Sequence, residues 1–280
     1  MKPLTLCEGL GFAEAPRWRD GRLFFSDMAA REVMTVTLDG EVETLCKFRD
    51  QPSGLGFLPG GDLLVVAMHS RRLLRRHEGE LSIHADLSEL VSADLNDMVV
   101  DAHGRAYVTN FGYDSVTEQP KTTGVTVVHP DGAIDTPIGE LFRPNGCAIT
   151  ADGQTLIVAE TRVHRIAAFS IDPQGHLSGQ REIGALPSGT WADGLCVDAE
   201  GAVWAADPKG CHCYRMTATG TISHTIGTAP MQAVACALGG PGRRTLFITL
   251  GEIRPFKEMA ADRRGRIDIV EVEVPGAGWP

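Results

Sequence analysis

The sequence predicts an all-β protein, a six-bladed β-propeller with four antiparallel strands in each blade. Three observations predict this fold: a strand–turn–strand unit that occurs six times, a second strand pair after most of these units, and no long segment with helical periodicity. Sequence units of roughly 40 to 50 residues with four strands each are typical of propeller blades. We expect residues 1–280 to form one such domain.

Each unit starts with a small or polar residue, runs through mainly apolar positions to a tight turn with glycine, and ends in an apolar strand. This pattern predicts a β-hairpin, because glycine adopts the backbone angles that tight turns between strands require. The six units are EAPRWRDGRLFFSD (14–27), SGLGFLPGGDLLVVA (53–67), NDMVVDAHGRAYVTN (96–110), NGCAITADGQTLIVAE (145–160), DGLCVDAEGAVWAAD (193–207) and ACALGGPGRRTLFITL (235–250).

A second strand pair follows in most units, with turns such as Asp39-Gly40 and Asp131-Gly132. These pairs are EVMTVTLDGEVETLC (32–46), RRLLRRHEGELSIHA (71–85), GVTVVHPDGAIDTP (124–137) and RIAAFSIDPQGHLSGQ (165–180). The segment around residue 90 forms at most a short turn of helix. We expect LTLCEG (4–9) to pair with RIDIVEVEV (266–274) in the last blade and so close the ring.

Composition narrows the class of partner. The chain has 26 Lys and Arg against 36 Asp and Glu, a formal net charge of −10. Nucleic acids bind to concentrated basic faces, so this balance argues against them. No stretch approaches the ~20 apolar residues that span a bilayer, and the first twelve residues lack the apolar core of a signal peptide. We expect a cytoplasmic protein that binds small molecules and no membrane.

The seven cysteines show no regular spacing. We expect reduced and mostly buried thiols, as in cytosolic proteins. Cys211-His212-Cys213 resembles a fragment of a metal site, but a zinc site needs a second ligand pair, and the sequence has none at the usual spacing.

One repeat position brings oxygen donors together. The first residue of each unit heads the first strand of its blade, and first strands line the central channel of a propeller. Side chains at this position therefore converge at one channel mouth. In chain order they are Glu14, Ser53, Asn96, Asn145, Asp193 and Ala235.

Two carboxylates and two amide oxygens form a set of ligands that suits a hard cation such as Ca²⁺. Two negative charges also balance a divalent ion, which offsets the cost of burying them. The competing interpretation is that Asn145-Gly146 and Asp193-Gly194 are ordinary turn pairs. Four donors at a single repeat position favour the metal site.

Four of these segments resemble the signature segments of the SMP-30/gluconolactonase/regucalcin family: EAPRWRDGRLFFSD, LNDMVVDAHGR, PNGCAIT and DGLCVDAEGAVWAAD. The resemblance extends from about residue 10 to 250. It implies a six-bladed propeller that holds one divalent cation, Ca²⁺ first with Zn²⁺ or Mn²⁺ as alternatives, and hydrolyses lactones. The family's metal ligands match Glu14, Asn145 and Asp193, and Asn96 matches the position of a substrate-binding or further metal-ligating asparagine.

The chain departs from the family in one place. The resemblance implies an arginine two residues before Asn96, where regucalcin-type members contact their sugar lactone, but this chain has Asp94. A carboxylate cannot replace a cationic hydrogen-bond donor. The departure argues against an aldonolactone substrate and leaves the hydrolase prediction in place.

The expected mechanism is attack of water on a lactone carbonyl that the cation polarises. Asp193 is our candidate for the general base, chosen on the family precedent over a hydroxide on the cation. We expect Arg17 and Trp191 beside the mouth as substrate-binding residues, with Trp191 as an apolar wall. The irregular segment 111–123 is expected to form part of the walls as well.

Other functions stay open at this point. The same set of Glu, two Asn and Asp occurs in calcium-dependent phosphotriesterase-like propellers, and a propeller can also bind calcium or a protein without catalysis. Lyases and condensing enzymes of similar fold are a third class. No GxSxG motif and no phosphate-binding loop occurs, which argues against a serine hydrolase and a nucleotide-binding protein.

Overall fold

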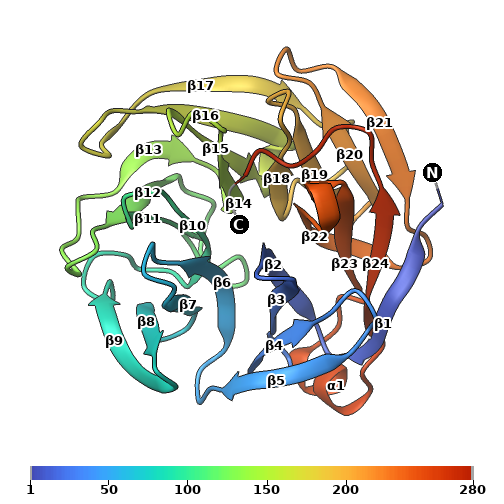
Figure 1. Ribbon diagram of the computed structural model, residues 1–280. Coiled ribbons are helices and arrows are strands. Elements are labelled where there is room, and N and C mark those ends of the chain that lie inside the picture. Colours follow the sequence, from blue (N-terminus) through green and yellow to red (C-terminus); the bar gives the residue numbers. More distant parts are fainter. Residues whose placement is uncertain (1, 279–280) are drawn as a thin grey trace.

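The computed structural model describes residues 2–278. It contains six antiparallel sheets of four strands each, arranged like blades around a central axis (Figure 1). The predicted six-bladed β-propeller is confirmed. The expected domain of residues 1–280 includes Met1 and residues 279–280, which lie outside the described residues.

The first three sheets follow the chain order, with the innermost strand first. They contain β2 (Ala13–Arg19), β3 (Arg22–Asp27), β4 (Glu32–Val36) and β5 (Val42–Lys47); β6 (Pro52–Phe57), β7 (Leu63–Ala67), β8 (Arg72–His77) and β9 (Glu80–Asp86); and β10 (Leu95–Val100), β11 (Ala106–Asn110), β12 (Thr123–Val128) and β13 (Ile138–Leu141).

The next two sheets repeat this order, and the sixth includes the first strand of the chain. They contain β14 (Pro144–Ile149), β15 (Thr155–Glu160), β16 (Arg165–Ile171) and β17 (Leu177–Ala185); β18 (Leu195–Val197), β19 (Val203–Asp207), β20 (His212–Met216) and β21 (Ile222–Gly227); and β22 (Gln232–Gly239), β23 (Thr245–Gly251), β24 (Gly265–Glu271) and β1 (Leu4–Leu10).

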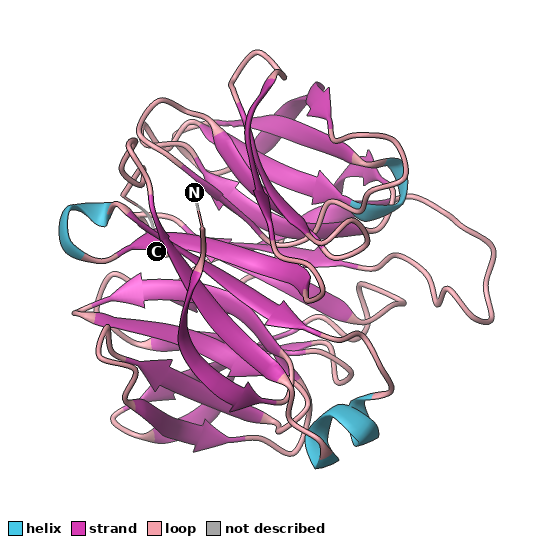
Figure 2. Cartoon of the chain, turned by 90° about the vertical axis from the view of Figure 1, so that its right-hand side faces the viewer, coloured by secondary structure: helices cyan, strands magenta, loops and turns pink. Residues whose placement is uncertain are grey.

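The ring closes through the two ends of the chain. Strand β1 pairs antiparallel with β24, with Leu4 opposite Ile269 and Leu10 opposite Gly265, as the sequence predicts. Figure 2 shows the blades from the side on which this closure lies. The pairing covers the outer edge of the last sheet, which would otherwise expose unpaired backbone groups.

The core lies between neighbouring blades. For example, Leu64 and Leu73 of the second blade pack with Met98 and Val108 of the third in one fully buried cluster. Burying a side chain of this size contributes about 1.5 to 3 kcal/mol. The apolar runs of the inner strands therefore fix the blades against one another and, with them, the geometry of the channel.

Some local features differ from expectation. The structure contains one short α-helix, α1 (Phe256–Ala261), and two 3₁₀ turns, η1 (Thr161–Val163) and η2 (Pro241–Arg243), that the sequence pattern does not predict. Strand β13 begins at Ile138, directly after the end of the expected strand pair 124–137, so the connection from β12 to β13 is longer than a hairpin turn. The segment near residue 90 forms turns without a helix.

All seven cysteines are free thiols and four of them are buried, which confirms that part of the prediction. No helix among residues 2–278 is long and apolar enough to cross a membrane. The cytoplasmic location stays a prediction.

Candidate metal and active site

The predicted donor residues lie together at one mouth of the channel. Glu14, Asn96 and Asn145 are each the second residue of an inner strand, and Asp193 lies two residues before the start of β18. In four blades the strand register is irregular just after this position, as between Glu14 and Arg17 in β2, and in the sixth it is irregular just before it. Such bulges bend a strand and re-aim its side chains. We call Glu14, Asn96, Asn145 and Asp193 the donor ring.

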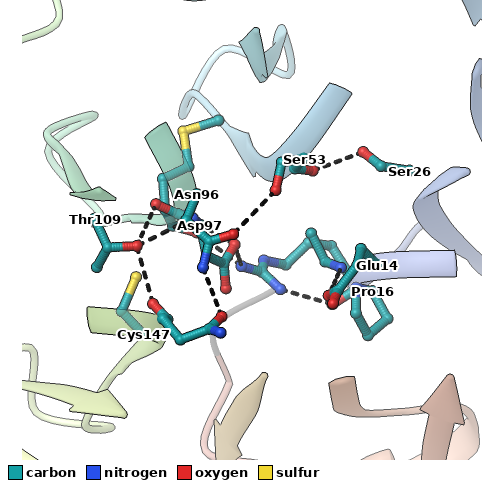
Figure 3. A network of polar contacts seen from close by, with 12 residues as sticks. Glu14, Pro16, Ser26, Ser53, Asn96, Asp97, Thr109 and Cys147 are labelled. Carbon is teal, nitrogen blue, oxygen red and sulfur yellow. Dashed lines mark hydrogen bonds and ion pairs between the residues drawn. The ribbon is translucent and has the colours of Figure 1, made fainter. Parts of the chain in front are cut away.

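Two members of the donor ring contact each other directly, and a third is their neighbour. The Asn96 amide donates from Nδ2 to Asn145 Oδ1 at 2.7 Å, and the Asn145 amide lies near enough to Asp193 to lower the pKa of that carboxyl. Asn145 Nδ2 also donates to Thr161 Oγ1 at 3.2 Å. Figure 3 shows the polar contacts around Asn96, with Glu14 on the side of the first blade. Asn145 is thus oriented by partners on both sides.

The two carboxylates of the donor ring are strongly destabilised as anions. The pKa of Asp193 is raised to about 8, chiefly by burial and also by the nearby Asp97, while Arg143 opposes the shift. Burial also raises the pKa of Glu14 well above its ordinary value, with Asp193 and Asp97 adding to the effect. Both shifts have the cause expected for anions that lack a compensating cation.

The residues fit a hard divalent cation. Two carboxylates and two amides supply only oxygen, and an amide oxygen with two lone pairs can accept a hydrogen bond and face a cation together. Among the described residues, no three His, Cys, Asp or Glu side chains are grouped as metal ligands. A cation at the donor ring would therefore need the two asparagine oxygens as well as the two carboxylates. Because the ring contains no nitrogen or sulfur ligand, it favours Ca²⁺ over Zn²⁺.

The glycines that follow the donor residues allow neighbouring inner strands to approach each other closely, and they do not form turns. A Cβ atom on Gly146 would lie 2.6 Å from Gly194 Cα, and one on Gly194 would lie 2.6 Å from Ala235 Cα. Gly54, after Ser53, has the same relation to Met98 N, at 2.6 Å. The alternative interpretation of Asn145-Gly146 and Asp193-Gly194 as turn pairs is wrong, because both pairs lie where inner strands of neighbouring blades meet.

An ion pair forms the floor of the site. Arg17 extends from β2 to β10, where it donates to Asp97 Oδ1 at 3.0 Å and to the Met98 carbonyl at 2.7 Å. Its guanidinium also donates to the Pro16 carbonyl at 2.9 Å, and the residue is 5% exposed. The expectation that Arg17 contacts substrate finds no support in this geometry, since its guanidinium is already bonded inside the channel.

Below this floor the channel is nearly closed. A cavity of about 30 Å³ remains there, lined by Arg17 together with inner-strand residues such as Cys147, Cys196 and Cys236. The C-terminal segment covers the far end, because Ala277 N donates to the Val197 carbonyl at 3.0 Å and Gly276 pairs with Asp198. Access to the donor ring is therefore from its own side of the propeller.

A second set of residues stands two positions before the first, and we call them the rim residues. Five of the rim residues lie in the loops that lead into the inner strands, and the sixth, Ala233, lies in β22. Four of them, in the first four blades, share one backbone contact: each carbonyl accepts from the residue just after the second strand, as in Phe111 N to Asp94 O at 3.0 Å and Thr161 N to Arg143 O at 3.3 Å. The rim residues are Phe12, Gln51, Asp94, Arg143, Trp191 and Ala233.

Trp191 is half-buried on this rim. Its backbone N–H donates to Asp207 Oδ1 at 2.9 Å, and its ring lies 6.0 Å from the Arg162 guanidinium and 5.9 Å from Lys209 Nζ. This position agrees with an apolar wall, and its contact with substrate stays a prediction.

Asp94 lies across the rim, with Oδ2 2.9 Å from His69 Nδ1, while Gln51 Oε1 lies 2.8 Å from His69 Nε2. Asp94, Phe111, Tyr113 and Arg143 line a cavity of about 340 Å³. Phe111 and Tyr113 belong to the irregular segment expected to form walls.

Three residues of the site were not predicted from the sequence. Asp97 and Thr161 carry no signal in the repeat, because each bonds to a different blade from its own. The repeat could have identified Arg143, because it stands two residues before Asn145 just as Asp94 stands two residues before Asn96.

The fold and the donor ring together define a six-bladed β-propeller with an oxygen-lined site at one channel mouth. The sequence profile of the SMP-30/Gluconolactonase/LRE-like region matches residues 12–252, so the chain belongs to this family. The resemblance seen in the sequence is thereby confirmed.

Individual relatives are distant. Regucalcin from Danio rerio is 23% identical over 251 residues, which cover 84% of this chain and 81% of that protein. The structure is similar to that of regucalcin from Agrobacterium tumefaciens, a calcium-binding protein, with a TM-score of 0.83, 20% identity and coverage of 100% of this chain and 96% of that one. A gluconolactonase from Xanthomonas campestris gives a TM-score of 0.78 at 24% identity, covering 98% and 89%. These structural likenesses show the shared fold.

Proposed function

We propose that this protein is a metal-dependent hydrolase that opens a lactone ring. The observation that carries the proposal is the donor ring, in which two buried carboxylates and two amides converge at the accessible channel mouth. Membership of the family and similarity to a gluconolactonase support the choice of lactones. Similarity to a calcium-binding regucalcin supports Ca²⁺.

Glu14, Asn145 and Asp193 would hold the cation, with Asn96 as a fourth ligand. When bound, the cation would act as a Lewis acid on the lactone carbonyl. The Arg17–Asp97 pair beneath the ring excludes bulk water from the channel and adds no net charge. We assign Arg17 a positioning role in place of the expected substrate contact.

Asp193 moves the proton in this proposal. As water adds to the lactone carbonyl, a carboxylate oxygen of Asp193 accepts its proton. When the ring C–O bond then breaks, the same proton passes to the departing alkoxide oxygen, so lactone and water give the hydroxy acid. Burial raises the pKa of this carboxyl in the metal-free protein, and a bound cation would oppose that shift and keep the carboxylate ionised to accept the proton. The stacked cations around Trp191 hold its ring beside the space where the lactone would lie.

The test is proton release from five- and six-membered lactones with added Ca²⁺, Mn²⁺ or Zn²⁺ and with chelator. We expect metal-dependent turnover in the wild type and a loss of at least about 100-fold in kcat for Asp193→Asn, as for other general bases. Asp152→Asn is the matched control, because Asp152 is exposed in the turn between β14 and β15 at the opposite end of the propeller.

Equal turnover by Asp193→Asn would contradict the role of Asp193. Bound cation without turnover of any lactone would contradict the lactonase function, and a phosphotriester in the same panel would then test the phosphotriesterase alternative.

A further inference from the structure

We propose that Arg143 selects the substrate of this site, and that the substrate is a lactone bearing an anionic group, a carboxylate fitting best, outside the reacting ring. The inference rests on the proposed lactonase function. It assigns the cationic role that the sequence lacks at Asp94 to the equivalent residue of the next blade.

The repeat itself relates the two positions. Asp94 and Arg143 are both rim residues, two positions before Asn96 and Asn145, and their carbonyls accept the same backbone hydrogen bond from the residue after the second strand. A cation on the fourth blade therefore faces the same mouth as one on the third blade would. The cationic group that is absent at Asp94 on the third blade is thus present at the equivalent position of the fourth blade, at Arg143.

Arg143 is held with its donors unused. Its guanidinium carbon stacks 4.0 Å from the centre of the Phe111 ring and lies 6.0 Å from that of Tyr113. Stacking occupies a face of the group and leaves its N–H edge available. Within residues 2–278, no carboxylate or hydrogen-bond acceptor pairs with this edge, whereas the buried Arg17 and Arg215 are bonded to carboxylates.

The backbone at Arg143 is also unusual. Its φ is 52°, in the left-handed region that costs a non-glycine residue roughly 1 to 2 kcal/mol. Arg31, Arg71, His164 and Cys211 share this conformation, but each lies in the turn that follows a second strand. Arg143 lies instead in the loop that leads into β14. The loop thus carries a strained residue where it presents a cation to the mouth.

The surrounding charges leave the cation available. Asp94, Asp114 and Glu118 line the cavity of about 340 Å³ together with Arg143. Asp94 lies 2.9 Å from His69, Glu118 lies 3.2 Å from Lys121, and Asp114 accepts from Val116 N at 2.8 Å. Asp94 and Glu118 each face a basic side chain and Asp114 is bonded to a backbone amide, so among the described residues none of the three forms an ion pair with Arg143. Arg162 and Lys209, stacked near Trp191, extend the positive charge along the rim.

These features favour an oxyanion of planar shape. The guanidinium presents parallel N–H donors that match a carboxylate in bidentate fashion, which a lysine cannot do. A lactone that retains a free carboxylate would place its ester at the donor ring and its anion at Arg143. Hydrolysis of such a lactone yields a hydroxy diacid.

The experiment compares matched lactones with and without a carboxylate, plus sulfonate, phosphate and amino counterparts, on the calcium-loaded protein. We expect the wild type to prefer an anionic lactone, and Arg143→Met to lose about 10- to 100-fold in kcat/KM for that lactone, the value of a charged hydrogen bond. The neutral lactone should change less than about threefold. The kcat/KM of Arg143→Lys for the anionic lactone should lie between those of the wild type and Arg143→Met. The anionic group that gives the highest kcat/KM identifies the group that Arg143 binds.

Arg31→Met is the control. Arg31 is exposed at the same end of the propeller and has a φ of 58°, so it matches Arg143 in residue type and backbone conformation. Calorimetric binding of hydroxy diacids to the wild type and Arg143→Met gives a readout that does not depend on turnover. Weaker binding in Arg143→Met, with unchanged calcium affinity, is expected.

A preference for neutral or amino lactones, or an equal loss on all lactones in Arg143→Met, would overturn the inference and leave the lactonase function intact. No turnover of any lactone would overturn the lactonase function instead. Binding of the hydroxy diacids would still test the role of Arg143 in that case, because equal affinity in the wild type and Arg143→Met would contradict it.

Discussion

At the residue scale, the donor ring places two carboxyl groups where burial opposes their ionisation. The pKa of Asp193 rises to about 8 and that of Glu14 rises well above its ordinary value, burial being the main cause of each shift. A divalent cation would reverse this preference by stabilising both anions. The same residues therefore link cation binding to pH.

The stability of the metal-free protein should fall as the pH rises between about 4 and about 8. In this range the folded protein retains a proton on Asp193 that the unfolded chain has already released, so raising the pH favours unfolding. Asp193→Asn has no proton to lose, and its melting temperature should decline less over the same range. Thermal melts in chelator at several pH values measure the difference.

Added Ca²⁺ should raise the melting temperature of the wild type more at pH 8 than at pH 5, because binding requires the ionised carboxylates. Parallel pH profiles for the wild type and Asp193→Asn in chelator would contradict the assigned shift.

At the scale of the element, the inner strands approach one another through small residues next to the donor ring. Gly194 is the tightest of these contacts, since a Cβ there would overlap Ala235 of β22. Gly194→Ala should destabilise the protein by about 1 to 3 kcal/mol, as overpacking does. It should also weaken Ca²⁺ binding, because the added methyl group displaces the neighbouring Asp193.

Gly227→Ala is the matched control. Gly227 ends the outer strand β21, and a Cβ there meets no atom within 4 Å. Thermal melts and calcium titrations of both variants measure the effect. A Gly194→Ala protein as stable and as calcium-competent as Gly227→Ala would show that close strand approach does not shape the site.

The elements also show how far the sequence predicts this protein. Alternating apolar positions and glycine turns identify every blade, because each hairpin is a local structure with its own signal. The repeat also identifies Glu14, Asn96, Asn145 and Asp193, because the symmetry of the propeller places equivalent residues of all blades at the same channel mouth. Contacts between blades have no such signal: the bond from Arg17 to Asp97 joins residues 80 positions apart. Helix α1, with only six residues, is too short for its periodicity to be detected.

At the scale of the whole molecule, the closed ring makes the channel mouth a fixed point. Strand β1 joins β24 at the outer edge, Arg17 and Asp97 fill the channel below the donor ring, and residues 276–277 cover the opposite end. Six blades thus hold four donor side chains without a separate binding loop. Most of the rim residues lie in loops, where members of one family can differ in substrate while sharing the ring.

The most direct test of this account is a calcium titration of the metal-free protein by calorimetry, followed by lactone hydrolysis on the same samples. We predict one Ca²⁺ per chain, affinity reduced at least about tenfold in Asn145→Ala, and hydrolysis that rises in proportion to the bound ion. Lactone hydrolysis that persists at full rate with no cation bound would contradict the account, as would a calcium affinity unchanged by loss of Asn145.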